Sequence, residues 1–373
     1  MPPLPPFGSG QMGGAPSRES RVSLEQLHHN ELAAHAFACA RDHLGPFVLP
    51  TRLQAMLACT CSAARQRFPR AADACTASHP ESHAQRMAFN YSAGSLLPNP
   101  CKCYVTTSAD DLRLLGDSLA LDHSVSSLIL HGGDLRFPGA HALSHWGLRL
   151  NTTLSSIDLG ATSMDACALQ AVADALRSDA CSKNVKTLSL ELNPLTARHD
   201  ANDEIDSSGI ASLANTIAEL RSLEALFLHC CGLDDFSVSI IAEACISRSQ
   251  NNQSRLRKLS LADNKKLCQV SGIPRAIRCG ASPVELYLSS TSISENAAKA
   301  LSNAILSAPE SCRMQRLVLH NTVQLGSIGV RSFERLAQLE EKERPMLGFV
   351  GGQSAPSAEE LAHLLSLGIV VTA

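Results

Sequence analysis

The sequence is poor in aromatic residues and carries no surplus of positive charge. Phe, Tyr and Trp together make up 4% of its 373 residues, so the aromatic surfaces on which single-stranded nucleic acids stack are not expected. Lysine and arginine total 32 against 35 aspartate and glutamate residues, which gives a formal net charge of −3. A chain with this balance has no excess of cations to neutralise phosphates, and we do not expect nucleic acid as its main partner.

Long apolar runs are also missing. No segment approaches the ~18 uninterrupted apolar residues of a membrane-spanning helix, so no membrane partner is expected. The first residues, Met1 to Gly8, have neither the basic region nor the apolar stretch of a secretion signal. The 14 cysteines are therefore expected to be reduced thiols. The predicted location is the cytoplasm, with the nucleus as the alternative.

Composition and periodicity divide the chain into three regions. Residues 1–22 are rich in Pro and Gly without periodicity, which predicts a disordered tail. Residues 23–98 show helical spacing of apolar residues and predict a small helical segment that ends in a linker. Residues 99–373 carry an internal repeat, which predicts a domain of about eight repeats with a cap at each end.

The repeat is an eleven-residue segment that recurs at intervals of 27 to 38 residues. Its fourth-position anchors are Leu128, Ile157, Leu188, Leu226, Leu259, Leu286, Leu317 and Leu347. The copies follow the pattern L-x-x-L-x-L-x-x-N/C-x-L, which is the signature of leucine-rich repeats. Because stretches with helical periodicity separate the copies, the chain from about Cys101 to Ala373 resembles the ribonuclease-inhibitor-like subclass of leucine-rich repeat proteins.

This resemblance implies an α/β horseshoe, with a curved parallel sheet inside and helices outside, preceded by the small helical segment. Positions 1, 4, 6 and 11 of each repeat are expected in the core, because a single repeat buries its apolar face only by stacking on its neighbours. Position 9 favours a small polar or thiol side chain that satisfies backbone groups after the strand. It is occupied by Thr162, Asn193, Cys231, Asn264, Thr291 and Thr322.

Positions 3, 5 and 7 are expected on the concave face, because alternate side chains of a strand point to opposite faces of the sheet. On repeats four to seven these positions hold the residues that we predict to bind a partner: Phe227, His229, Lys258, Glu285, Tyr287, Arg316, Val318 and His320. Phe227, Tyr287 and Val318 are expected to be exposed there, and aromatic and arginine side chains are the usual anchors of protein interfaces. The alternative is that they are isolated exposed residues of a kind common on soluble proteins.

The helical segment carries a second resemblance. Glu31 to Phe37, followed by Leu49-Pro50 and an apolar helix that ends at Thr60 to Arg65, is similar to an F-box over residues 27–68. That family binds a Skp-family adaptor of a ubiquitin ligase. The resemblance therefore implies a substrate receptor, in which the repeats capture the substrate. The alternative is a plain helical cap on the repeat domain.

A third hypothesis rests on the longest repeat interval, which spans 38 residues. It contains an insertion, Thr196–Ser208, with Arg198 inside it, and GTPase-activating proteins of the Ran type share the horseshoe. An arginine on a protruding loop can stabilise a transferring phosphoryl group, so GTPase activation is an alternative function. The acidic residues of the same insertion favour a solvated surface loop instead.

Sequence motifs of catalysis and metal binding are absent. The chain has neither a G-x-S-x-G elbow nor an H-E-x-x-H motif. Its C-x-C pairs, at Cys59 and at Cys101, lack the two-residue spacing typical of zinc sites. Three further cysteines occupy repeat positions where burial is expected: Cys167, Cys231 and Cys245. We therefore predict no catalytic residue, metal or cofactor, and a non-enzymatic intracellular scaffold that binds a partner protein on its concave face.

Overall fold

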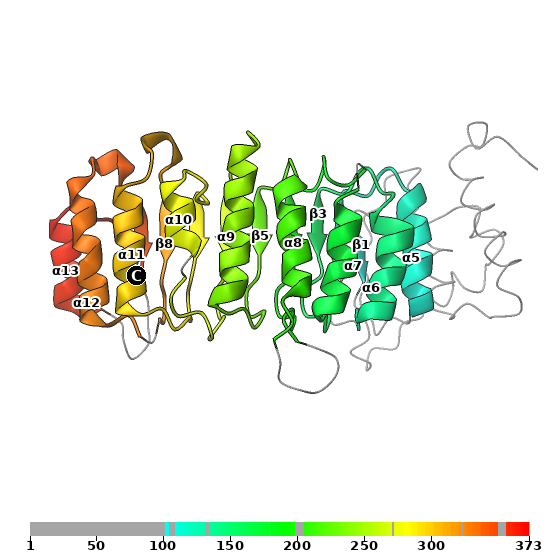
Figure 1. Cartoon of the computed structure of the whole chain (residues 1–373), viewed down its shortest axis with the longest axis horizontal. Helices are drawn as coiled ribbons and strands as arrows, with labels where there is room; N and C mark the ends of the chain where they lie inside the picture. Colours follow the sequence, from blue (N-terminus) through cyan, green and yellow to red (C-terminus); the bar gives the residue numbers. More distant parts are fainter. Residues whose placement is uncertain are drawn as a thin grey trace, which may run out of the picture.

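The computed structural model describes residues 101–103, 109–130, 134–178, 180–197, 205–270, 272–322, 324–349 and 356–372. Within these ranges, strands and helices alternate along an elongated array, and a row of helices covers one face of the sheet (Figure 1). The tail at 1–22, the helical segment at 23–98 and the F-box resemblance at 27–68 lie outside the described residues, as does Arg198. These four features stay predictions.

The strands are short, and each α-helix of the repeats follows its strand. The strands are β1 (Cys101–Cys103), β2 (Ser127–Leu130), β3 (Ser156–Asp158), β4 (Thr187–Ser189), β5 (Ala225–Phe227), β6 (Lys258–Ser260), β7 (Glu285–Tyr287), β8 (Arg316–Val318), β9 (Met346–Gly348) and β10 (Val371–Thr372). The α-helices are α5 (Ala109–Leu121), α6 (Phe137–Leu143), α7 (Ala166–Leu176), α8 (Ser208–Glu219), α9 (Asp235–Gln250), α10 (Gly272–Arg278), α11 (Glu295–Leu306), α12 (Gly326–Arg331) and α13 (Ala358–Ser366). Shorter turns of helix are η3 (Ser144–Leu148), η4 (Glu310–Cys312), η5 (Ser332–Gln338) and η6 (Glu341–Glu343).

The described strands form one ten-stranded parallel sheet, in which β1 to β10 follow the order of the sequence. The fourth-position anchors lie opposite one another from strand to strand, as Leu188, Leu226 and Leu259 do across β4, β5 and β6. All eight anchors are buried. Parallel neighbours need a crossover connection, and the helices supply it. The structure therefore confirms the predicted α/β solenoid and the strand register on which the concave positions were assigned.

The core contains the expected leucines, with one correction at position 11. In repeats five and seven that position falls on Lys266 and Gln324, which are exposed, and the buried residues are Leu267 and Leu325. The cause in repeat five is a longer turn: the Leu267 N–H donates to the carbonyl three residues back, at Asn264, over 3.0 Å. In repeat three the corresponding bond spans only two residues. The extra residue displaces the buried leucine by one position.

Position 9 behaves as predicted. Asn193 is fully buried, and its Nδ2 donates to the carbonyl oxygens of Leu159 (2.8 Å) and Leu190 (2.9 Å). Its Oδ1 accepts the backbone N–H groups of Thr162 (2.9 Å) and Met164 (3.0 Å) in the preceding repeat. One side chain thus satisfies backbone groups of two successive repeats, which are too far from water to be solvated.

Position 8 adopts a left-handed backbone in every repeat in which it is described. The φ angles of Ala161, Leu192, Cys230, Asp263, Ser290 and Asn321 lie between 52° and 58°. This conformation lets the position-8 N–H continue the sheet ladder, as Cys230 does by donating to the Ala262 carbonyl over 2.9 Å. For a non-glycine residue the left-handed conformation costs about 1–2 kcal/mol of conformational free energy. Because most of these residues are not ones that favour the left-handed region, the turn was not evident from the sequence.

A buried arginine joins repeats three, four and five. Arg248 of α9 is 1% exposed, and its guanidinium donates only to backbone carbonyls. Nη2 contacts the oxygens of Leu223 (3.0 Å) and Ser254 (2.9 Å), and Nη1 contacts those of Ile217 (3.0 Å) and Leu220. Burial lowers its pKa. The five hydrogen bonds of the guanidinium reach carbonyls near the end of α8, before β5 and after α9, so one side chain joins three stretches of backbone.

Four of the described helices, α7, α9, α11 and α13, begin at a side chain that caps the first turn, and the array ends in a last helix and strand. Asp165 accepts the Ala168 N–H (2.8 Å) at the start of α7, and Asp234 accepts the Ser237 N–H (2.8 Å) at the start of α9. These bonds satisfy amides that have no partner within the first helical turn. At the far end, α13 begins with a capping box at Ser357, and β10 pairs with β9. A last helix and a last strand thus end the described part of the array.

Candidate partner-binding surface

Six of the eight residues assigned to the concave face lie on strands β5 to β8, and His229 and His320 lie in the turns that follow β5 and β8. Phe227 ends β5 and Tyr287 ends β7, and both side chains are half-buried. Ser260 of β6 pairs with both residues, so it lies between them. Two strand steps of about 4.8 Å separate the two aromatic residues by roughly 10 Å. We call Phe227 and Tyr287 the aromatic pair.

The repeat between the two aromatic residues presents small side chains on this face. Ser260 at position 5 and Ala262 at position 7 of the same repeat are each 8% exposed. Two half-buried rings thus stand on either side of a low, largely covered strand.

Val318 corrects the predicted surface. It was expected to be exposed, but it is 6% exposed. The neighbouring strand has Gly348 opposite it, and a β-carbon built at Gly348 would lie 3.2 Å from Val318 Cγ1 and 3.1 Å from His320 Cε1. The absence of a side chain at Gly348 lets Val318 and His320 pack over β9. Val318 therefore contributes little apolar area to the concave face.

The Tyr287 ring is held by the side chain of Glu285, which in turn contacts Lys258. The Tyr287 hydroxyl donates to Glu285 Oε2 over 2.6 Å, and Lys258 Nζ lies 3.6 Å from the same oxygen. The charge-assisted hydrogen bond restricts the Tyr287 ring before any partner arrives. Restriction of this kind lowers the entropy cost of binding. Arg316, one strand further on, donates from Nη2 to the sulfur of Met346 over 3.3 Å.

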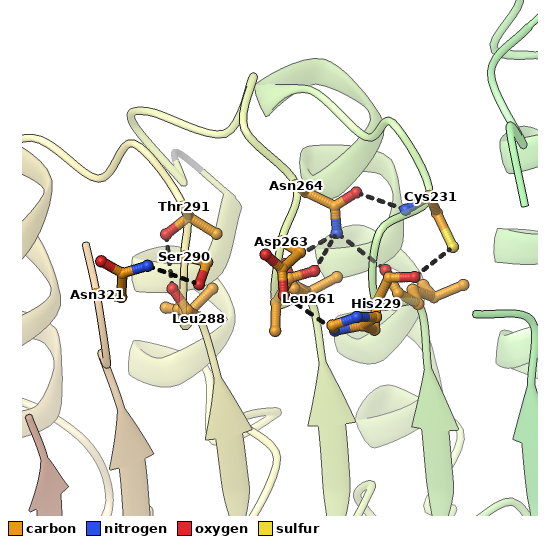
Figure 2. A network of polar contacts seen from close by, with 11 residues as sticks. His229, Cys231, Leu261, Asp263, Asn264, Leu288, Ser290, Thr291 and Asn321 are labelled. Atoms are coloured by element: carbon orange, nitrogen blue, oxygen red, sulfur yellow. Dashed lines mark hydrogen bonds and ion pairs between the residues drawn. The ribbon is translucent and has the colours of Figure 1, made fainter. Parts of the chain in front are cut away.

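His229 and His320, the two histidines among the predicted binding residues, lie in different surroundings. His229 Nδ1 is 3.4 Å from Asp263 Oδ2, an ion pair when the imidazole is protonated (Figure 2). Asp263 occupies the left-handed position 8, which turns its carboxylate toward the neighbouring repeat. His320 has no carboxylate near it among the described residues, and its Nδ1 has no hydrogen-bond partner there. Burial lowers the pKa of His320, so its neutral form is favoured.

The described residues contain no group of three or more His, Cys, Asp or Glu side chains placed to hold a metal ion. Among them, no helix has both the length and the apolar character to cross a membrane. Cys231 and Cys245 are buried as expected, and Cys167 is exposed, because it faces outward on α7.

Comparison with known proteins agrees with the fold. The chain is similar to leucine-rich repeat-containing protein 73 of Rattus norvegicus and of Homo sapiens, with 27% identity over 179 residues in each case. The parallel sheet and alternating helices are consistent with a leucine-rich repeat fold. The alignment covers 43% of this chain and 55% of each relative, so the chain spans about half the length of the curated relatives it matches. No family model matches the sequence.

Proposed function

We propose that this leucine-rich repeat protein is a non-enzymatic scaffold that binds a partner protein on the concave face of β5 to β8. The observation that carries the proposal is the aromatic pair. Phe227 and Tyr287 are half-buried on a sheet whose apolar core lies on its other side, so neither ring has a place in that core. Aromatic residues in such positions dominate the energetics of protein interfaces.

The rigidity of the array supports the same function. The strands are in register from β1 to β10, and Asn193 and Asn264 bind successive repeats together through buried hydrogen bonds. A surface of this kind exists before the partner arrives. Binding then requires little ordering of the backbone, which favours affinity at a given contact area.

Affinity purification with mass spectrometry tests the proposal on the full chain. The test variant is Phe227→Ala with Tyr287→Ala, and the control variant is Phe137→Ala with Phe236→Ala, two exposed phenylalanines on helices α6 and α9. We expect a partner to be retained by the wild type and the control and lost from the test variant. Equal recovery by all three proteins would place the binding site elsewhere.

The two alternative functions rest on residues outside the described ranges, and we propose them second to the scaffold. An F-box-type receptor requires that residues 27–68 bind a Skp-family adaptor, and a Ran-type GTPase-activating protein requires Arg198 at a nucleotide. The same purification separates them. Recovery of Skp and cullin subunits favours the receptor, and recovery of a small GTPase favours GTPase activation. A cytoplasmic or nuclear location, which all three functions share, is checked by fluorescence microscopy of the tagged full chain.

A further inference from the structure

The concave face carries opposite charges on the two sides of the aromatic pair. Toward β4, Glu191 is half-buried at position 7, and its carboxylate has no side-chain partner among the described residues. Toward β8, Arg316 contacts a thioether sulfur, a weak acceptor, and forms no ion pair within 4 Å among the described residues. Glu285 lies opposite it on β7, between Lys258 and Arg316, so these three side chains together carry a net positive charge.

The centre of the surface is neutral by comparison. Lys258 and Glu285 lie 3.6 Å apart and offset each other. His229 faces Asp263 at 3.4 Å, so this pair brings no unopposed positive charge. The order along the array is therefore an acidic side, an apolar centre and a basic side. A partner with the complementary order gains attraction at both ends, whereas like charges would repel it.

From this order we infer that the concave face binds a segment of its partner with a basic residue at one end, an apolar residue in the middle and an acidic residue at the other end. The apolar side chain contacts the aromatic pair above Ser260 and Ala262. The basic side chain pairs with Glu191, and the acidic side chain pairs with Arg316. The inference rests on the proposed function and adds the chemistry of the partner.

The strand spacing sets the distance between these three contacts. Strand β6, between the aromatic pair, is two steps from β4 and two from β8, or roughly 10 Å on each side. Glu191 and Arg316 also lie two residues from the row of the aromatic pair, in opposite directions along their strands, which adds roughly 7 Å along the strand. Each diagonal distance is therefore roughly 12 Å, which an extended segment rising about 3.3 Å per residue bridges with about four residues. A helical segment rises about 1.5 Å per residue and needs about eight. Both spacings are specific enough to be recognised in selected sequences.

A phage-displayed library of random 16-residue peptides, selected on the full chain, tests the inference. We expect enriched peptides to share the basic, apolar and acidic order at one of these spacings. A fluorescein-labelled synthetic peptide of the most enriched sequence then gives affinities by fluorescence polarisation. The Phe227→Ala, Tyr287→Ala variant should bind it about thirtyfold more weakly, as expected for loss of a central aromatic anchor.

Charge reversal separates recognition of the ends from apolar contact alone. Glu191→Lys should weaken the peptide about fivefold, and replacing the basic residue of the peptide by Glu should restore affinity for that variant. Glu359→Lys on α13 makes the same change of net charge far from β4 and should leave affinity unchanged. Circular dichroism checks that each variant folds.

The outcomes distinguish this inference from the function on which it rests. Enriched peptides that depend on the aromatic pair but show no charge order, or are unaffected by Glu191→Lys, would overturn the inference and leave the concave site standing. Peptides that bind equally well without the aromatic pair would overturn both. Failure to enrich any peptide would show that the partner is not recognised through a linear segment, and the inference would be wrong.

Discussion

Replacement of Asn264 tests how much the hydrogen bonds of position 9 contribute to stability. Its Oδ1 accepts the backbone N–H groups of Cys231 (3.0 Å) and Leu233 (2.9 Å), and its Nδ2 donates to carbonyls that include those of Leu228 and Leu261 (Figure 2). Asn264→Ala leaves two buried amides without an acceptor. A buried donor that loses its partner costs about 1–3 kcal/mol. We therefore expect the free energy of unfolding to fall by about 4 kcal/mol.

Two further variants serve as controls for this prediction. Asn264→Thr should cost about half as much, because Thr162 holds the same position in repeat two and donates from its hydroxyl to the Leu159 carbonyl over 2.8 Å. Asn296→Ala, at an exposed site on α11, should leave stability unchanged. Urea denaturation followed by circular dichroism measures the three changes.

Hydrogen exchange makes the test local, because neighbouring repeats in a solenoid can unfold separately. The Cys231 and Leu233 amides should be protected in the wild type and exchange quickly in Asn264→Ala, while amides in repeat two keep their protection. A loss of stability below about 1 kcal/mol, with both amides still protected, would refute the role assigned to position 9.

Three more predictions concern buried polar and thiol groups. Arg248→Met should lower the free energy of unfolding by about 3 kcal/mol, because several buried carbonyls lose their donor, and a thermal melt equal to that of the wild type would contradict this. Burial lowers the pKa of His320 below its ordinary value of 6.5, so the unfolded chain takes up a proton first as the pH falls. Stability should therefore decrease on acidification below about pH 6.5, and denaturation of His320→Gln should lack this part of the pH dependence. Burial raises the pKa of the Cys231 thiol to about 12, whereas Cys230 is exposed. Iodoacetamide at neutral pH should alkylate Cys230 and spare Cys231 in peptide mass spectrometry, and equal labelling would show that the turn is assigned wrongly.

The sequence by itself determined the repeat and the parts of the fold that follow from it. Each anchor from Leu128 to Leu347 can be recognised within its own repeat, because each strand shows its own alternation of inward and outward side chains. Stacking of near-identical units then allows little choice of topology. The roles of Asn193 and Asn264 were predictable for the same reason, since the turn after each strand leaves the same backbone groups to be satisfied.

The tertiary structure decided which side chains meet across strands that are 27 to 38 residues apart in the sequence. Val318 is buried because Gly348 lies opposite it, and Leu267 replaces Lys266 in the core because its turn is one residue longer. The 3.6 Å contact from Lys258 on β6 to Glu285 on β7 likewise depends on side-chain orientation. Contacts between neighbouring repeats depend on the shapes and rotamers of the side chains that pack there. They cannot be predicted from the order of residues within one repeat.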